Sequence, residues 1–333
     1  MSGGGEAEGR RLWYFSPEGG SSQPVGRSDL SVKNFLWPAP VLPGELVAVA
    51  APASHVSRPA WEAGVQILQD WGFRVRCGPE VFEPRAYGVA TDQQIARRFT
   101  EIWLDPEVKA VVGVRGGYGS LKLLPHLDLN ALKTHSKRLV GFSDITNLLW
   151  YFHHGLGLVT FHGPNVAQLP DLTPGARQNF YEWLTAPGPQ AITYRNLTVL
   201  HPGVATGPLA GGNLTTLCHL VGTPYAPRMA GYLLFLEDHN EALYRLDRML
   251  HHLIFAGVLD GVRGVVLGGF THCGSQDGLL EVLTTALAPL NVPVLLGLPV
   301  GHQPDNHTLP LGAWARLDTG AASLTLLASS SLP

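Results

Sequence analysis

Apolar residues in the first half of the chain form short continuous runs that alternate with helical patterns. The runs predict strands, because strands buried in a parallel sheet are apolar on both faces. They lie at residues 45–54, 73–77, 108–114, 138–142 and 156–161. Between them, apolar residues three or four positions apart predict helices over 58–73, 91–106 and 145–154. Strands that alternate with helices favour a doubly wound parallel sheet.

The pattern changes over residues 171–205, where proline and glycine surround one short helical pattern. We expect a linker between two domains there. Beyond it, the pattern predicts strands at 232–237, 264–270, 292–299 and 315–320, and helices near 213–221, 241–256 and 279–288. The predicted fold is therefore α/β.

Four segments follow from these patterns. We expect residues 45–170 to form a doubly wound parallel-sheet domain, and residues 206–330 to form a smaller, β-rich α/β domain. Residues 1–44 are rich in Gly, Ser, Pro and charge, and predict an irregular extension partly docked on the domain that follows. Residues 171–205 are the linker.

Composition narrows the function classes. Of 333 residues only 15% are charged, and the formal net charge of −3 gives no electrostatic reason to expect nucleic acid or an anionic membrane as partner. Three distant cysteines, Cys77, Cys218 and Cys273, imply no disulfide framework. The start of the chain has no apolar stretch typical of a signal peptide, and no run is long enough to span a membrane. We expect a cytoplasmic protein.

The stretch LVGFSDITNLLW, residues 139–150, places Ser143 where a buried strand gives way to a helix. A serine there can cap the helix, or it can be a nucleophile on a tight strand-to-helix turn. The flanking Gly-x-Ser matches half of the G-x-S-x-G elbow, but Ile145 replaces the closing glycine. From this stretch alone, the capping role is favoured.

A glycine-rich turn follows another strand in VVGVRGGYGS, residues 111–120. Its glycines let backbone amides approach a ligand closely, so Gly116 and Gly117 are candidate donors to a developing oxyanion. The alternative is a turn that binds nothing. The patterns of dinucleotide- and phosphate-binding loops are absent. Because carboxyl ends of parallel strands meet at one crevice, this turn and Ser143 are expected to lie close together.

Two polar clusters in the second half can supply a base and a carboxylate. Glu237–Glu241 directly follow a buried run, although a solvated turn would explain them too. His302 follows another strand end, with His307 nearby, yet most of the 14 histidines should be structural or exposed. His239, His272, Cys273, His302 and His307 lack metal-ligand spacing. We therefore expect no metal and no other cofactor.

Seven motifs in this order resemble the LD-carboxypeptidase family of serine peptidases, which includes murein tetrapeptide carboxypeptidases and microcin-resistance peptidases. The motifs are AAPAS, GVRGGYGSLKLLPHLD, GFSDITNLL, TFHGPN, GGNLTTLCHLVGTP, LEDHNEALYRLDRML and GHQPDNHTLPLG, and the resemblance covers residues 45–327. It implies a flavodoxin-like or Rossmann-like N-terminal domain and a smaller C-terminal α/β domain, with the active site between the two.

The resemblance implies a triad of Ser143 as nucleophile, His302 as base and Glu237 as the acid that orients the base. Ser120 in GGYGS is implied not to be the nucleophile. The amides of Asp144, Gly116 and Gly117 are the implied oxyanion donors.

For the substrate, the resemblance implies release of D-alanine from the L,D amide bond of a murein tetrapeptide during peptidoglycan recycling. Arg115 is a candidate partner of the terminal carboxylate, and Glu241 of an amino group; for each, an ion pair that fixes a loop is the alternative. His162, where a small residue is commoner in the family, bears on fine specificity. The resemblance also implies a homodimer.

Two alternatives stay open. The RGGYG and LEDHNE stretches favour the murein branch, but a microcin-resistance-type peptidase that cleaves peptidyl-nucleotide amides would use the same motifs. A non-catalytic peptide-binding protein would use the same cleft without turnover.

Overall fold

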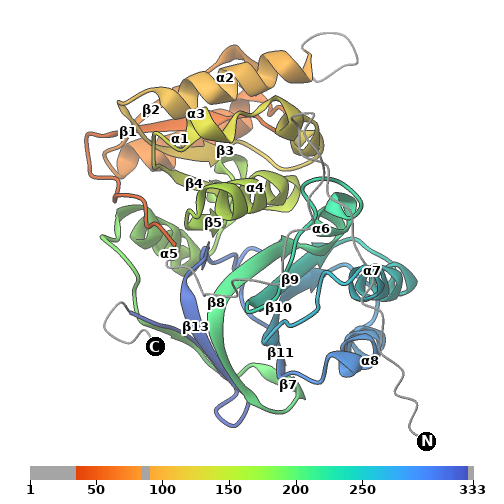
Figure 1. Cartoon of the computed structure of the whole chain (residues 1–333). Helices are drawn as coiled ribbons and strands as arrows, with labels where there is room; N and C mark the ends of the chain where they lie inside the picture. The colour runs from red at the N-terminus through yellow and green to blue at the C-terminus, as the bar shows by residue number, and fades with distance from the viewer. Residues whose placement is uncertain (1–34, 84–90, 329–333) are drawn as a thin grey trace, which may run out of the picture.

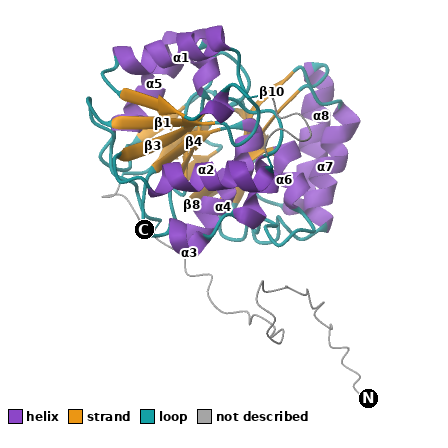
Figure 2. Ribbon diagram, turned by 90° about the horizontal axis from the view of Figure 1, so that it is seen from above, coloured by secondary structure: helices purple, strands orange, loops and turns teal. Residues whose placement is uncertain are grey.

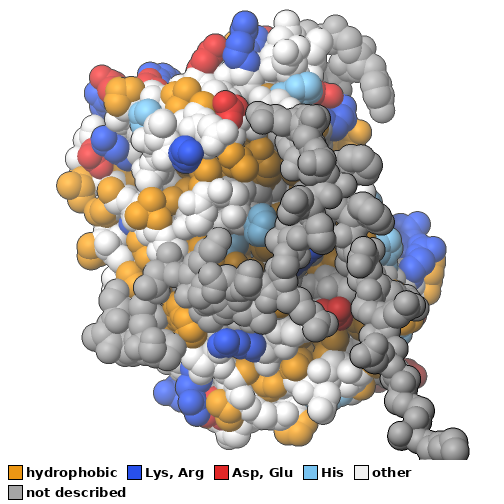
Figure 3. Space-filling model, in the orientation of Figure 1, with side chains coloured by type: hydrophobic (Ala, Val, Ile, Leu, Met, Phe, Trp, Pro, Cys, Tyr) orange, Lys and Arg blue, Asp and Glu red, His pale blue; other side chains and the backbone are white. Residues whose placement is uncertain are grey.

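A computed structural model describes residues 35–83 and 91–328, and shows two β-sheets that lie next to each other with helices around them (Figure 1). Most of the extension expected over residues 1–44 lies outside the described residues. None of the helices in the described part of the chain has the length and hydropathy that a membrane span needs. On the face in Figure 3, acidic and basic side chains are interspersed among hydrophobic and uncharged ones.

Among the described residues, the N-terminal sheet has six strands in the order β12-β5-β4-β3-β1-β2. They are β1 Leu46–Ala50, β2 Arg74–Cys77, β3 Val108–Gly113, β4 Arg138–Gly141, β5 Thr160–His162 and β12 Leu309–Leu311. All neighbours are parallel except β12, which pairs antiparallel with β5. This is the parallel sheet that the apolar runs predict.

Helices cover both faces of this sheet (Figure 2). Their bounds are α1 Arg58–Asp70, α2 Asp92–Leu104, α3 Leu129–Leu132, α4 Thr146–Leu156 and α5 Pro174–Thr185. Strand β1 is buried throughout: Val47 and Val49 join the core with α1 and α5, whereas Ala48 and Ala50 join the core with α2 and α4. A strand that faces two helical layers cannot carry polar residues on either side, which explains its continuous apolar run.

The C-terminal sheet has eight strands within the described residues, in the order β6-β14-β13-β8-β9-β10-β11-β7. They are β6 Ile192–Tyr194, β7 Thr198–His201, β8 Val204–Asn213, β9 Leu233–His239, β10 Gly264–Thr271, β11 Val294–Leu296, β13 Trp314–Asp318 and β14 Ser323–Leu326. The central strands β8 to β11 are parallel, and the outer pairs are antiparallel. Helices α6 Leu214–Leu220, α7 Leu243–Phe255 and α8 Gln276–Leu287 pack on one face.

Short 3₁₀ helices complete the described elements: η1 Pro79–Val81, η2 Ser120–His126, η3 Ser143–Ile145, η4 Val166–Asp171 and η5 Ala288–Leu290. The segment 171–205 contains more regular structure than its proline and glycine pattern predicts. It holds helix α5 and the strands β6 and β7, which occupy the two edges of the C-terminal sheet. Strand β12, from the C-terminal part of the chain, pairs with β5, so the N-terminal sheet contains one strand from the C-terminal part.

Residues 35–44 are docked on the N-terminal sheet by a buried arginine. Arg138 is fully buried, and its guanidinium donates to the carbonyls of Pro38, Ala39, Trp183 and Ala186. Burial lowers the Arg138 pKa to about 10, which leaves it protonated at neutral pH. Four carbonyl dipoles therefore take the place of a carboxylate partner.

Parallel strands of both sheets direct their carboxyl ends toward the boundary between the halves. From the N-terminal sheet, β3 leads into the glycine-rich turn and β4 leads into Ser143. From the C-terminal sheet, β9 carries Glu237 and β11 leads into the loop with His302. This convergence is the usual position of ligand sites in open α/β sheets.

Candidate active site

Ser143 occupies a strained turn between β4 and α4. Its backbone has φ of +61°, a left-handed conformation that is costly for a residue with a Cβ, and η3 begins at the same residue. The chain reverses sharply there and leaves the serine half-buried. Phe142 holds the N-cap position of η3 and Ile145 that of α4, so Ser143 caps neither helix. A tight strand-to-helix turn of this kind can also present a nucleophilic serine.

The missing elbow glycine at position 145 has a structural explanation. Ile145 is fully buried, and a methyl group at Gly141 would lie 2.7 Å from its Cγ2. At Gly113, a methyl group would lie 3.3 Å from its Cγ1. Glycines on the two strands therefore leave the space that the Ile145 side chain occupies.

The glycine-rich turn lies directly against Ser143. A methyl group at Gly116 would lie 2.9 Å from Ser143 Cβ and 3.0 Å from its Oγ. Ser54 holds the turn: its amide donates to the Gly116 carbonyl, and its hydroxyl accepts from the Tyr118 amide. Among bonds between described residues, the amides of Gly116 and Gly117 have no protein acceptor. They are thus placed to donate to a ligand oxygen beside Ser143.

Ser120 is engaged in the structure of this turn. It is fully buried, its amide donates to Asp144 Oδ2 at 2.8 Å, and its hydroxyl donates to the Asp144 carbonyl at 2.5 Å. Asn147 Nδ2 donates to the same hydroxyl. Ser120 therefore ties the glycine-rich turn to the turn of Ser143.

Glu237 and His302 are in direct contact. His302 Nδ1 lies 2.7 Å from Glu237 Oε2, and the Glu237 side chain is fully buried while that of His302 is 18% exposed. Burial of His302 favours its neutral form, but the hydrogen bond and charge of Glu237, aided by Asp238, raise the His302 pKa above its usual value. The contact leaves Nε2 as the ring nitrogen available for another group.

A second layer of polar side chains holds Glu237. Asn213, at the end of β8, donates to Glu237 Oε1 at 3.2 Å and to Asp238 Oδ1 at 3.1 Å. Thr215 donates to Asp238 Oδ2 through both its amide and its hydroxyl. Burial and the charge of Glu237 raise the Asp238 pKa. With these donors in place, the oxygen of Glu237 that faces His302 has a fixed direction.

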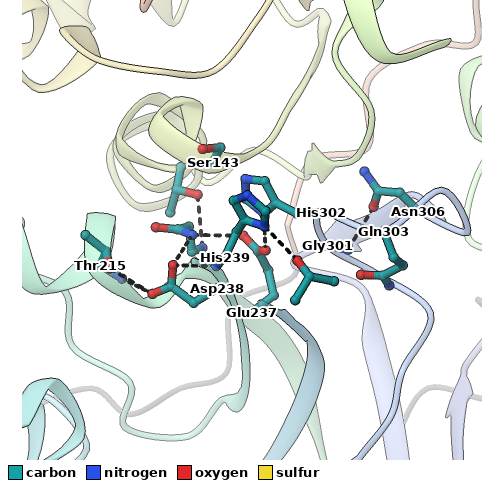
Figure 4. Close-up of polar contacts among 12 residues, drawn as sticks. Ser143, Thr215, Glu237, Asp238, His239, Gly301, His302, Gln303 and Asn306 are labelled. Atoms are coloured by element: carbon teal, nitrogen blue, oxygen red, sulfur yellow. Dashed lines mark hydrogen bonds and ion pairs between the residues drawn. The ribbon is translucent and has the colours of Figure 1, made fainter. Parts of the chain in front are cut away.

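Figure 4 shows Ser143 above the His302 ring and Glu237 below it. The Phe142 ring, one residue before Ser143, lies 4.7 Å from the His302 ring. Within the described residues, no hydrogen bond joins Ser143 Oγ to His302. Such bonds are often long without substrate and shorten when it binds.

The two candidate charged contacts to substrate differ. Arg115 is exposed, and its side chain makes no ion pair with another described residue. Glu241 accepts from Thr215 Oγ1 at 3.4 Å and pairs with Arg245 at 3.4 Å, and it is 17% exposed. Glu241 thus makes contacts of the kind that fix a loop, which is the alternative to a role in substrate binding.

His162 is fully buried next to this site. Neither of its ring nitrogens has a hydrogen-bond partner among the described residues, and burial lowers its pKa to about 4. Its ring contacts the edges of Phe142 and Phe235. An effect on specificity would therefore act through packing beneath the site.

The other histidines do not form a metal site. Across residues 35–83 and 91–328, no three histidine, cysteine or acidic side chains are grouped so that they could hold a metal ion. His239 instead stacks on His302, with ring centroids 4.9 Å apart. The Nε2 atom of His307 lies 3.4 Å from Asp305 Oδ1.

The roles of Asn213 and Thr215 and the stacking of His239 on His302 were not predicted from the sequence. Asn213 had a signal in the sequence: it directly follows the glycine pair Gly211 and Gly212 at the end of the stretch GPLAGGN. The contact between His239 and His302 had none, since 63 positions separate the two residues.

Comparison with known proteins places the chain in a family. The model of the LD-carboxypeptidase N-terminal domain matches residues 47–163, and that of the C-terminal domain matches residues 206–317. The chain is 34% identical over 287 residues to the murein tetrapeptide carboxypeptidase of Pseudomonas aeruginosa, covering 82% of this chain and 92% of that protein. It therefore belongs to the LD-carboxypeptidase family, a family of peptidases.

Members of both branches resemble it. The microcin C7 self-immunity protein MccF of Escherichia coli is 28% identical, with 85% of this chain and 93% of that protein covered. The crystal structure of an MccF-like protein from Bacillus anthracis gives a TM-score of 0.80 at 26% identity, covering 88% and 99%. That of the muramoyltetrapeptide carboxypeptidase from Oxalobacter formigenes gives 0.75 at 32%, covering 84% and 97%. The α/β fold with a parallel N-terminal sheet is shared with these structures.

Proposed function

We propose that the protein is a serine-type LD-carboxypeptidase with Ser143, His302 and Glu237 as its catalytic triad. The observation that carries this proposal is the 2.7 Å contact between the buried Glu237 carboxylate and His302 Nδ1, next to a serine at φ of +61°. A buried carboxylate fixes the tautomer of the imidazole, so Nε2 can accept a proton from a serine hydroxyl.

In the proposed reaction, Ser143 Oγ attacks the carbonyl carbon of the scissile amide while His302 Nε2 takes the hydroxyl proton. The amides of Gly116, Gly117 and Asp144 stabilise the oxyanion. His302 then gives the proton to the leaving amine, the C–N bond breaks, and an acyl-Ser143 ester remains. Water, deprotonated by His302, hydrolyses the ester and restores the serine. Glu237 stabilises the imidazolium in both steps.

We propose a murein tetrapeptide as substrate and its C-terminal D-alanine as the released product. Two of the similar proteins are named as carboxypeptidases of such a tetrapeptide. The exposed guanidinium of Arg115, directly before Gly116, suits a terminal carboxylate. Glu241 would meet an amino group only by sharing its existing contact with Arg245, so its part in binding is the weaker of the two.

The remaining parts of the proposal follow from the family. We propose a cytoplasmic homodimer that acts in peptidoglycan recycling. Its functional units would be a nucleophile-bearing domain at 45–170 and a domain at 206–330 that bears the acid and base, with 1–44 as an extension and 171–205 as the connection between them. Light scattering of the purified protein tests the dimer.

The test is mass spectrometry of a purified murein tetrapeptide incubated with wild-type protein, Ser143→Ala and Ser120→Ala. We expect loss of one D-alanine with wild type and Ser120→Ala, and none with Ser143→Ala. Because Ser120 is buried and hydrogen-bonded, a thermal melt must first show that its variant is folded at the assay temperature.

Each other outcome decides between alternatives. If wild type leaves the tetrapeptide intact but cleaves a peptidyl-nucleotide amide, the microcin-resistance type is correct, as the similarity to MccF would allow. If it binds tetrapeptide without cleaving either compound, it is a binding protein. Cleavage by Ser143→Ala would refute the triad.

A further inference from the structure

The ring of His239 lies flat against the ring of His302. Their centroids are 4.9 Å apart and their planes differ by 12°, and Figure 4 shows the two rings overlapping. His239 is the last residue of β9, two positions after Glu237. The strand that supplies the acid thus also supplies a ring that covers one face of the base.

His239 is itself fixed by the neighbouring strand. Its Nδ1 lies 2.9 Å from Thr271 Oγ1, and its backbone amide donates to Asp238 Oδ1 at 2.8 Å. Thr271 is its register partner on β10, and the Asn240 amide donates to the Thr271 carbonyl. Although the His239 side chain is exposed, these contacts hold it in one conformation.

The contact with Glu237 alone does not define the plane of the His302 ring. Together with the Cβ–Cγ bond, the hydrogen bond at Nδ1 sets the ring orientation only within that bond's tolerance in distance and angle, so the imidazole can still rock about Cβ–Cγ. The Phe142 ring, at 4.7 Å and an angle of 59°, touches His302 without lying parallel to it. The parallel stack with His239 limits this rocking, and hence the range of directions open to Nε2.

We infer that His239 is a positioning residue, which stacks on His302 and keeps its Nε2 directed toward Ser143. The inference rests on the proposed triad. It assigns to His239 no contact with the substrate and no proton transfer.

Charges around the pair are consistent with a neutral His239 during turnover. Partial burial and the neighbouring rings of His302 and His272 lower the His239 pKa, and Glu237 raises it by less. Glu237, with Asp238, raises the His302 pKa. Because the two environments push the pKa values apart, the first proton goes to His302, and His239 stays uncharged beside the imidazolium.

Three variants separate stacking from other roles. His239→Ala removes the ring, and His239→Phe keeps a flat ring without titratable nitrogens. His272→Asn is the matched control, because His272 contacts His239 at 5.4 Å and has φ of +58°, which asparagine tolerates. Two readouts are needed: kcat and KM for tetrapeptide cleavage against pH, and NMR titration of the His302 imidazole in a Ser143→Ala background.

We expect His239→Ala to lower kcat by roughly 10-fold with little change in KM, since misdirection of a reacting group acts on the chemical step. It should also raise the His302 pKa, because loss of the covering ring exposes the imidazolium to water. His239→Phe should restore most of kcat and leave the His302 pKa close to that of wild type. His272→Asn should resemble wild type in both readouts.

Two results would overturn the inference. One is a His239→Ala variant with unchanged kcat and unchanged His302 titration. The other is a His239→Phe variant as impaired as His239→Ala, which would show that the imidazole nitrogens matter rather than the flat ring. The NMR titration needs no substrate, so it tests the stack even if wild type fails to cleave tetrapeptide, a result that would count against the proposed function alone.

Discussion

Gly116→Ala adds one methyl group at the point where the glycine-rich turn meets Ser143. The new carbon would lie 2.9 Å from Ser143 Cβ and 3.0 Å from Oγ, whereas ordinary contacts begin at 3.4 Å. Gly116 is not among the glycines at positive φ, so its backbone accepts alanine without strain. The substitution therefore acts through this one collision, which requires a displacement of about half an ångström.

The expected loss of kcat depends on which atoms move to relieve this collision. Ser143 lies in a tight turn at φ of +61°, and Thr216 Oγ1 donates to its carbonyl at 3.5 Å. The side chain and the glycine-rich turn must therefore share the movement. A misplacement of about 1 Å costs on the order of 10²-fold in rate, so half that distance should lower kcat by roughly 10-fold. Overpacking of this kind destabilises a fold by about 1–3 kcal/mol.

The assay is the rate of tetrapeptide cleavage at saturating substrate, alongside urea denaturation. Gly175→Ala is the matched control, because it adds the same methyl group where no atom lies within 4 Å and φ is not positive. We expect it to keep wild-type kcat. Wild-type kcat in Gly116→Ala, in a protein shown by denaturation to be folded, would refute the placement of this turn against the proposed nucleophile Ser143.

Two further predictions concern buried charges. In the proposed triad only neutral His302 accepts the Ser143 proton, so activity should fall as the pH drops through the raised His302 pKa. Glu237→Gln removes the main cause of the raised pKa, and should shift the acid limb of the kcat/KM profile to lower pH while kcat drops by about four orders of magnitude. An unshifted limb would contradict this. Arg138→Met leaves four carbonyls without their donor, and should reduce the free energy of unfolding by about 3–5 kcal/mol in a urea titration. A loss of less than about 1 kcal/mol would show that the docking of residues 35–44 does not depend on Arg138.

Much of the N-terminal fold could be predicted because its signals are local. The run at Leu46–Ala50 is apolar on both faces, and the helix over Arg58–Asp70 shows its buried side every three or four residues. The strands β6, β7 and β12 were not predicted. Each has three or four residues and forms only by pairing with a strand distant in sequence, so the chain carries no local pattern for it.

The candidate site divides in the same way. Strand ends rich in glycine or acidic residues pointed to Gly116 and Glu237, because such residues rarely follow a buried run for packing reasons. The hydrogen bonds of Ser120 with Asp144 and Asn147 could not be predicted in this way. They form because β3 and β4 are neighbours in the sheet, which brings together residues that are 24 or more positions apart in the chain. Contacts across the two halves, such as His302 with Phe142, depend on how the sheets meet and leave no trace in spacing.

The most direct test of the central claim is detection of the acyl-enzyme. Wild-type protein is mixed with murein tetrapeptide, quenched in acid within the first turnover, digested, and mapped by mass spectrometry. The proposed triad predicts a peptide that contains Ser143 and carries the mass of the tripeptide acyl group, absent in Ser143→Ala and present in Ser120→Ala. An acyl group on any other residue, or tetrapeptide cleavage by Ser143→Ala, would contradict it.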